Sequence, residues 1–246
     1  MIIVDAHTHI GIERLYNLVM TSEDLLRTME KNDIDKAIVQ PQAGAPDIMS
    51  NHEEIAELCI KYPGRIYGMA SFNPVMDDEQ EYFERVRWAI EDLGFKGIKL
   101  HTNGHGISPL NPYSQRVFEA GMRFSVPVMI HTGAGVPNAL PSLCIPPARK
   151  YPQLKLVLAH AGGGTYAAEA QIVAQECDNV YLETSWVSPP EVGGFIQAIG
   201  SERVMYGSDI FENVAAYLAL YYNLGLSEDD LARVLGKTAT DLYNLE

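Results

Sequence analysis

Eight short apolar runs alternate with helical segments along the whole chain, and this alternation restricts the fold more than any other feature of the sequence. Several runs are continuously apolar, as expected for parallel strands that are buried on both faces. Strands that alternate with helices favour a parallel sheet, and eight units favour closure into a (β/α)8 TIM-like barrel over an open doubly wound sheet. The predicted strands are Ile2–His9, Lys36–Gln40, Ile66–Asn73, Gly97–His101, Val126–His131, Lys155–His160, Val180–Ser185 and Arg203–Asp209.

Helical periodicity fills the gaps between these runs. Glu81–Leu93 carries an apolar stripe that ends before Gly94, and Ser227 can cap a helix whose third residue is Asp230. We find no linker or composition break, so residues 1–246 are expected to form a single domain. The other predicted helices are Glu23–Lys31, Glu53–Tyr62, Gln115–Phe124, Thr165–Glu176 and Glu191–Ile199.

The charge balance argues against nucleic acid and anionic membranes as partners, because 18 basic and 32 acidic residues give a net charge of −14. The three cysteines, Cys59, Cys144 and Cys177, show neither a disulfide framework nor metal-type spacing. No run of about 18 apolar residues and no secretory signal is present. We therefore expect a cytoplasmic protein.

Polar residues gather at the ends of the predicted strands. In Asp5-Ala6-His7-Thr8-His9 the two histidines share a strand face, so both should point into the barrel. His131, His160 and Asp209 end three other strands, on the face where barrel enzymes build their active sites. Imidazoles with one carboxylate are typical of a divalent metal site, with zinc favoured and manganese or iron as alternatives.

These strings resemble the amidohydrolase superfamily, in particular its compact branch that includes aminocarboxymuconate-semialdehyde decarboxylase and lactone hydrolases. The resemblance is carried along the whole chain by His7-x-His9, Met129-Ile130-His131-Thr132-Gly133, Leu158-Ala159-His160-Ala161-Gly162, Tyr206-Gly207-Ser208-Asp209 and the segment Gly94 to His101. It implies a metal-dependent barrel enzyme. It also implies that His7, His9, His131 and Asp209 are metal ligands, and that His160 is an acid–base residue or, with two metals, a further ligand. Asp209 would share the acid–base role with His160.

Lys99 and His101 share strand parity, so both are expected to face the interior. Several superfamily members carry a carboxylated lysine on the corresponding strand. In the compact branch a single metal is usual, and an unmodified Lys99 would neutralise charge or bind a substrate carboxylate. His101 is expected to contact substrate. His105 would be a lid contact or a solvated loop residue, and His52 is expected to be structural.

Two glycine clusters, Gly133-Ala134-Gly135 and Gly162-Gly163-Gly164, follow predicted strands. They could present N–H groups to an anion, but tight turns explain them better. Arg14 and Arg149 could anchor a carboxylate, and a surface position explains them at least as well.

The leading functional hypothesis is hydrolysis of an amide, lactone or ester of a small molecule by metal-activated water. The alternative is non-oxidative decarboxylation of a small aromatic or unsaturated carboxylic acid, for which the same ligands would serve. A non-catalytic ligand-binding barrel is the third hypothesis, and the complete ligand set argues against it. We also expect a homo-oligomer, because short loops would leave an apolar rim.

Overall fold

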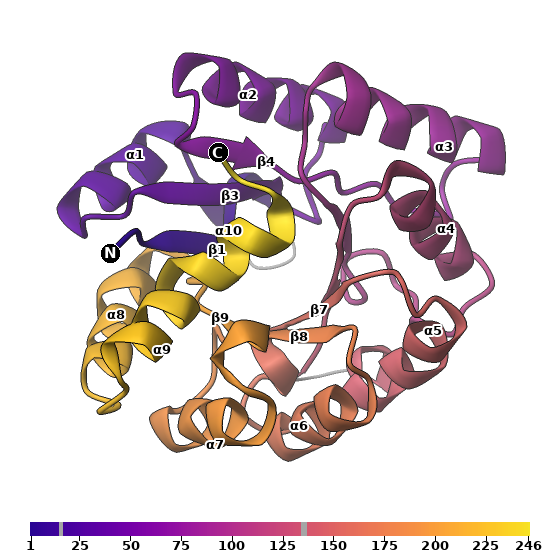
Figure 1. Ribbon diagram of the computed structural model, residues 1–246. Helices are drawn as coiled ribbons and strands as arrows, with labels where there is room; N and C mark the ends of the chain where they lie inside the picture. The colour runs from indigo at the N-terminus through magenta and orange to yellow at the C-terminus, as the bar shows by residue number, and fades with distance from the viewer. Residues whose placement is uncertain (15–16, 134–136) are drawn as a thin grey trace.

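A ring of parallel strands surrounded by helices forms the body of the molecule (Figure 1). This computed structural model describes residues 1–14, 17–133 and 137–246. Two sheets, ordered β2-β1-β3-β4 and β5-β6-β7-β8-β9, make up the ring, and of the strands in these described ranges only β2 pairs antiparallel, along the end of β1. The strands are β1 Val4–Glu13, β2 Leu18–Met20, β3 Lys36–Pro41, β4 Ile66–Gly68, β5 Ile98–Leu100, β6 Val128–His131, β7 Leu156–Ala159, β8 Val180–Glu183 and β9 Val204–Met205.

Single parallel bridges join the two sheets at both seams and close the ring. Ala70 pairs with Ile98 at one seam, and Thr8 pairs with Asp209 at the other. Across the second seam the Asp5 carboxylate accepts hydrogen bonds from the N–H and hydroxyl of Ser208, at 3.0 and 2.6 Å. The predicted (β/α)8 TIM-like barrel is therefore confirmed.

Most of the predicted elements appear with shifted ends. The predicted strand Ile66–Asn73 is too long, since β4 ends at Gly68 and pairing returns only in the bridge at Ala70. The helix predicted from Glu53 begins at Ile48, because Asp47 caps it by accepting from Ser50 N at 3.0 Å. The helices are α1 Ser22–Lys31, α2 Ile48–Lys61, α3 Glu79–Arg87, α4 Ser114–Phe124, α5 Ile145–Lys150, α6 Ala167–Glu176, α7 Pro189–Ile199, α8 Val214–Tyr222, α9 Glu228–Ala232 and α10 Thr238–Tyr243.

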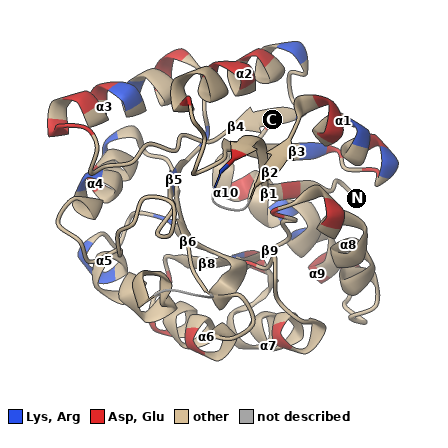
Figure 2. Ribbon diagram, turned by 180° about the vertical axis from the view of Figure 1, so that it is seen from behind, with Lys and Arg blue, Asp and Glu red and all other residues tan. Residues whose placement is uncertain are grey.

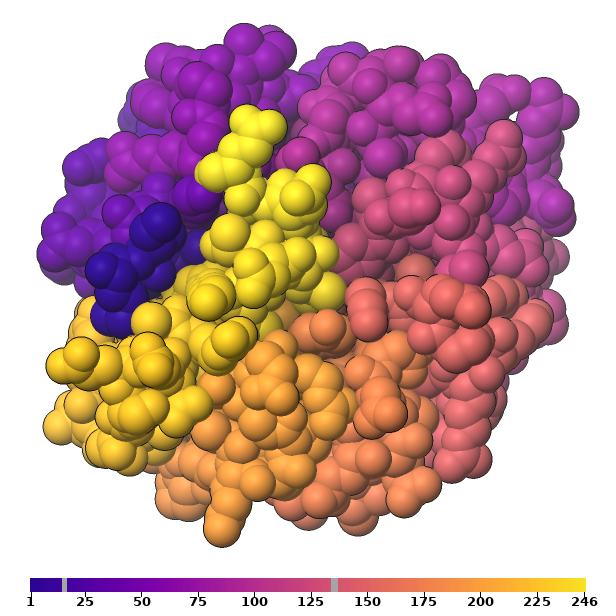
Figure 3. All heavy atoms as spheres, in the orientation of Figure 1, coloured from indigo at the N-terminus to yellow at the C-terminus, as the bar shows by residue number. Residues whose placement is uncertain are grey.

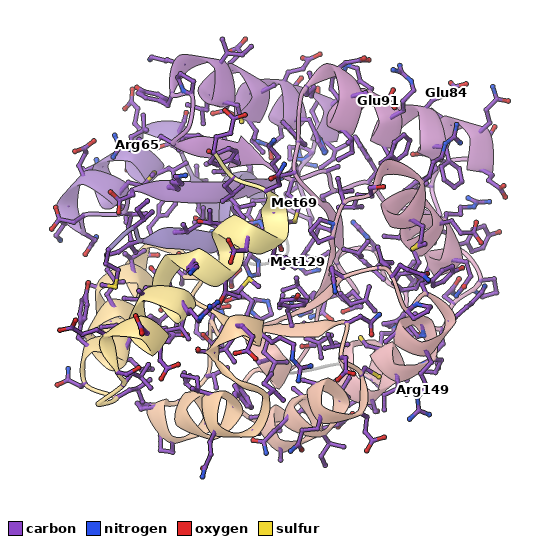
Figure 4. The ribbon with its side chains drawn as sticks, viewed as in Figure 1. Arg65, Met69, Glu84, Glu91, Met129 and Arg149 are labelled. Atoms are coloured by element: carbon purple, nitrogen blue, oxygen red, sulfur yellow. The ribbon has the colours of Figure 1, made fainter. Side chains whose placement is uncertain are left out.

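The interior of the barrel is filled by side chains from the strands, and α10 covers one end of it. Met69 and Met129 lie near the middle of the ring, whereas Arg65 and Arg149 lie at its periphery (Figure 4). Tyr243 of α10 belongs to the same buried interior cluster as the two methionines. In Figure 3 the C-terminal segment lies across the middle of this face. The barrel therefore has its opening at the opposite end, where the strands finish.

Lysine, arginine, aspartate and glutamate residues lie mostly on the outer helices, as the coloured bands of the ribbon in Figure 2 show. Within the described ranges, we find no helix with the length and apolar character needed to cross a membrane.

His52 has the structural role that the sequence predicts. Its ring stacks on Phe72 with centroids 4.2 Å apart and planes 8° apart. Nδ1 donates to Ile48 O at 2.6 Å, and Nε2 accepts from Ser71 N at 3.0 Å. Burial, which outweighs the hydrogen bond to Ile48, lowers the pKa of His52 to about 4, so the folded protein holds this ring neutral.

We predict that His52 makes folding sensitive to mild acid. An unfolded histidine binds its proton near its ordinary pKa of 6.5, whereas the folded one resists until about pH 4. The stability contributed by the neutral ring is complete above pH 6.5 and falls as the pH drops toward 4. It should fall by about 2 kcal/mol between pH 7 and 5.

Urea unfolding of the wild type and His52→Phe at each pH measures this contribution. At pH 7 the variant should have a lower free energy of unfolding than the wild type. On acidification to pH 5 its free energy of unfolding should fall by about 2 kcal/mol less than that of the wild type. Between pH 8 and 7 the two curves should run parallel. Equal losses down to pH 5 would contradict the prediction.

Candidate functional site

The predicted donor residues meet at the carboxyl end of the barrel. The Nε2 atoms of His7 and His9 lie 3.1 Å apart, and Asp209 Oδ1 lies 3.4 and 3.3 Å from them. Donor atoms of His7, His160 and Asp209 all lie within 4.8 Å of one another. His131 Nδ1 lies 3.0 Å from His160 Nε2. All five side chains thus form one continuous cluster.

An irregularity in the pairing of β1 sets the orientation of the His7 and His9 side chains. The pairing of β1 with β3 shifts between Asp5 and Thr8, which marks a β-bulge. Val4 and Ala6 pack into the barrel interior, whereas His7 and His9 face the other donors, so the change of face falls within the irregular stretch, between Ala6 and His7. The bulge therefore changes which residues of β1 face the interior, from even-numbered to odd-numbered positions, at the first histidine of the site.

The nitrogens of His7 and His9 that face Asp209 carry no proton. His7 Nδ1 lies 2.6 Å from Glu183 Oε2, and His9 Nδ1 lies 3.1 Å from Pro41 O. A carboxylate and a carbonyl only accept hydrogen bonds, so we assign each ring proton to Nδ1. Burial, with the nearby Lys99 charge, also lowers the pKa of His7 well below its usual range and keeps the ring neutral.

Three electron pairs, on two Nε2 atoms and Asp209 Oδ1, therefore converge on one point. Such an arrangement is stable when a cation lies between them. The other oxygen of Asp209 is held by Trp186, whose Nε1 donates to Oδ2 at 2.7 Å. Only Oδ1 remains directed at the histidines. The residues present fit a divalent metal.

Three residues of the site have strained backbones. His160, Trp186 and Asp209 have φ angles of 65°, 62° and 66°. A left-handed conformation costs a non-glycine residue about 1–3 kcal/mol, and such residues cluster at functional sites. Gly162, Gly163 and Gly164 continue the left-handed turn after His160, with φ of 85°, 58° and 71°. This supports the turn interpretation of the second glycine cluster.

Gly133 of the other cluster permits a close approach of two loops, while Ala134 and Gly135 lie outside the described residues. A Cβ at Gly133 would lie 2.9 Å from the backbone of Gly162 and Gly163, next to the turn that carries His160. The φ of Gly133 is +116°, which disfavours any side chain.

We predict that Gly133→Ala destabilises the fold by about 2–4 kcal/mol, since backbone strain and a backbone clash add. Urea unfolding at pH 7 measures the loss. Gly64→Ala is the matched control: Gly64 has φ +74°, and its Cβ would meet nothing within 4 Å. If the free energy of unfolding falls equally in the two variants, the backbone clash at Gly133 does not contribute to the destabilisation.

Lys99 and His101 lie on different sides of the cluster. Lys99 is buried beneath the donors, with Nζ 3.0 Å from His7 Nε2, and burial lowers its pKa to about 8. This position fits the charge-neutralising role better than contact with substrate. His101 stacks on His131, with ring centroids 4.4 Å apart and planes 15° apart, and lines the cavity above the donors. His105 is buried next to it, since His105 Nδ1 accepts from His101 N, so it is not a solvated loop residue.

A cavity of about 470 Å³ opens above the donor atoms. None of its described lining residues is lysine or arginine, so the lining supplies no cationic side chain to a substrate. Trp186, which is 46% exposed, forms part of the wall. The lining residues are His9, Glu13, Leu18, Gln42, His101, Asn103, His131, Thr132, His160, Gly163, Trp186, Asp209 and Ile210.

The two arginines named from the sequence lie outside this cavity. Arg149 is largely exposed and pairs with Glu176 at 3.3 Å, and Arg14 is exposed near the tip of the β1–β2 hairpin. Figure 4 shows Arg149 at the outer edge of the molecule. Both therefore take the surface role.

Sequence reasoning missed Glu183, Ser185, Trp186 and Asn103. Asn103 Nδ2 lies 3.1 Å from His131 Nε2. Glu183 ends β8 and Ser185 and Trp186 follow it, so a strand-end position was the available signal. These are single polar residues without a repeated spacing, and no pattern in the sequence connects them to the histidines.

Comparisons with known proteins agree with this fold. The family model described as Amidohydrolase matches residues 4–245. A comparison with curated proteins finds no match. The similar solved structures include 5-carboxyvanillate decarboxylase from Sphingomonas paucimobilis, at 15% identity and a TM-score of 0.78, covering 100% of this chain and 99% of that one.

Two further decarboxylases are similar over nearly their full lengths. For 2,6-dihydroxybenzoate decarboxylase from Rhizobium the identity is 18% and the TM-score 0.76, with coverage of 100% of this chain and 99% of that chain. A dihydroxybenzoic acid decarboxylase from Polaromonas sp. JS666, solved with bound manganese and the inhibitor 2-nitroresorcinol, is 19% identical, with a TM-score of 0.75. The match covers 99% of this chain and 97% of that chain. At these identities the likeness shows a shared fold.

Proposed function

The chain belongs to the amidohydrolase family, and from that membership we propose that it is a metal-dependent, non-oxidative decarboxylase of a small aromatic carboxylic acid. The observation that carries the choice of reaction is the whole-length fold likeness to three decarboxylases of hydroxylated aromatic acids. The converging donor atoms and the cavity above them support the same choice.

We propose that His7, His9 and Asp209 are ligands of one divalent metal, with an imidazole of the His131–His160 pair completing the set. The sequence-based expectation that His131 is this ligand stays a prediction. We propose manganese in place of zinc, since the Polaromonas enzyme binds manganese and a mixed carboxylate–imidazole set accepts it. Held by these side chains, such an ion would supply a Lewis acid next to the substrate carboxylate.

The chain's own residues would orient the ring and move one proton. In the reaction the carbon–carboxylate bond breaks, CO₂ leaves, and a proton takes its place on the ring carbon. His160 and Asp209 both line the cavity beside the donors and are the proposed proton carriers. The exposed indole of Trp186 and the stacked His101 would lie against the flat substrate.

Hydrolysis of an amide, lactone or ester, the leading hypothesis from the sequence, has support only from membership of the family. The non-catalytic barrel is disfavoured because every predicted donor is present in one cluster. The small-molecule substrate agrees with the size of the cavity. The expected homo-oligomer and the cytoplasmic location stay predictions.

A labelled-substrate experiment separates the reactions. The manganese-loaded protein is incubated in D₂O with carboxyl-¹³C-labelled hydroxybenzoates, including 2,6-dihydroxybenzoate and 5-carboxyvanillate, and in parallel with lactones and anilides. Decarboxylation releases ¹³CO₂ and leaves one deuterium on the carbon that lost the carboxylate. Turnover of a lactone or anilide, without ¹³CO₂ from any acid, would overturn the proposal in favour of hydrolysis.

A further inference from the structure

Glu183 is buried behind the donor cluster, and its contact with His7 Nδ1 is the one role given to it so far among the described residues. We propose that it is a positioning residue, whose carboxylate fixes the ring protons of both His7 and His160 on Nδ1 and so leaves an electron pair on Nε2 of each ring, His7 as a metal ligand and His160 facing the same site. This inference rests on the proposed metal site and not on the reaction. It assigns a function to a residue that does not line the cavity and does not contact substrate.

The carboxylate of Glu183 is surrounded by donors. Its side chain is 0% exposed. Oε2 lies 2.6 Å from His7 Nδ1 and accepts from His160 N at 3.0 Å. Oε1 accepts from Ser185 N at 2.6 Å, and the Ser185 hydroxyl donates to Oε2 at 3.0 Å. Two of these donors are backbone N–H groups, one at each oxygen, so both oxygens must act as acceptors.

The hydroxyl of Ser185 extends this control to His160. Because Ser185 Oγ uses its proton toward Glu183, it can only accept from the ring of His160, whose Nδ1 lies 2.8 Å away. His160 therefore carries its proton on Nδ1 and keeps an electron pair on Nε2. One carboxylate thus sets the proton position on His7 directly and on His160 through one hydroxyl.

The packing around Glu183 is specific to a glycine at position 207. A Cβ there would lie 2.6 Å from Glu183 Oε1 and 2.8 Å from His7 Cβ. Gly207 lets the carboxylate reach between β1 and the residues after β9, where no larger side chain would fit. The Tyr206-Gly207-Ser208-Asp209 string therefore supplies space for Glu183 as well as the Asp209 donor.

A carboxylate that orients a ligating histidine raises metal affinity, and its loss costs about 10- to 100-fold in affinity. Glu183→Leu removes every acceptor while keeping a similar volume. Ser185→Ala removes the link to His160 and one hydroxyl donor to Glu183, but it leaves the contact between Glu183 and His7. The two variants should therefore differ in a defined way, because the first affects two rings and the second affects one.

Long-range ¹H–¹⁵N spectra of the metal-free full chain report which nitrogen of each ring carries the proton. In the wild type, His7 and His160 should both be protonated on Nδ1. Ser185→Ala should change the His160 pattern alone, and Glu183→Leu should change both patterns. His52, held by Ile48 O and Ser71 N, is the internal control and should be unchanged in all three spectra.

Competition with a chelator then measures the dissociation constant for Mn²⁺, and thermal melts confirm that each variant folds. We expect Glu183→Leu to bind manganese roughly 10- to 100-fold more weakly than the wild type. Unchanged His7 and His160 patterns in Glu183→Leu would overturn the inference, as would a dissociation constant within about twofold of the wild type. A wild type that binds no metal would refute the proposed function instead, and the ring patterns would still test Glu183.

Discussion

The double variant His7→Ala/Asp209→Ala is expected to lose its metal. Protein purified without chelators should carry about one equivalent of a transition metal per chain in the wild type, and less than roughly a tenth of that in the variant. The physical reason is that the pair supplies two of the three electron pairs that converge on one point, with Asp209 Oδ1 3.4 Å from His7 Nε2. Elemental analysis measures the metal, and decarboxylase activity should fall with it.

Arg149→Ala is the matched control for this experiment. Arg149 lies on the surface, where it contacts Glu176 and Cys177 and no residue of the donor cluster among the described residues, so metal content and activity should stay at the wild-type level. Wild-type metal content in the double variant would contradict the predicted ligand set. About two equivalents in the wild type would instead support a carboxylated Lys99 that bridges two metals, with His160 as a ligand.

His160→Asn is expected to reduce turnover by about 10²- to 10⁴-fold, the usual contribution of a positioned acid–base group. His160 lines the cavity, and burial lowers its pKa to about 3, so the resting ring is neutral. In the proposed reaction His160 would take a proton from solvent water and pass it to the ring carbon that loses CO₂. If His131 is the ligand, the variant should retain its metal. Single-turnover kinetics with the labelled acid and metal analysis of the same sample check both parts.

His131→Asn is the partner variant, because His131 Nδ1 lies only 3.0 Å from His160 Nε2. The sequence-based assignment predicts metal loss in His131→Asn and metal retention in His160→Asn. The reverse pattern would assign the ligand to His160, which has the tighter grouping with His7 and Asp209. Retention of both metal and turnover in His160→Asn would contradict its catalytic role.

The reaction is harder to assign than the metal site. Hydrolysis and decarboxylation need the same donors, so the histidines and Asp209 cannot distinguish them. The distinguishing features are the walls of the cavity, such as the exposed Trp186 and the stacked His101, and these are set by loops rather than by strand ends. Hydrolysis led the sequence-based hypotheses only because it is the commoner chemistry of the superfamily that the chain resembles. Decarboxylation stays a proposal that the labelled-substrate experiment tests.

Several errors in the predicted elements have one cause. The predicted strand Ile66–Asn73 is apolar throughout its first half, but pairing stops at Gly68, where Phe95 from a neighbouring segment packs so closely that a Cβ at Gly68 would meet its ring at 2.3 Å. Strand length is thus decided by tertiary packing, which local periodicity does not report. Helix α8, with apolar residues all around it, was missed for the related reason that it lacks a polar face.

The order of strands and the residues at their ends were determined by the sequence alone. Apolar runs separated by helical segments form a parallel barrel, and a barrel brings all its carboxyl strand ends to one rim. His7, His9, His131, His160 and Asp209 could therefore be assigned to one site without coordinates.

Only the tertiary structure decided how those side chains are aimed. The bulge between Asp5 and Thr8 changes the strand parity before His7, and the left-handed backbones of His160 and Asp209 direct their side chains toward it. Glu183 became part of the site only when the closed barrel brought the ends of β8 and β1 together across β9, since 176 residues separate Glu183 from His7. Proton positions and ligand directions depend on hydrogen bonds between distant strands, and short-range sequence patterns do not encode such contacts.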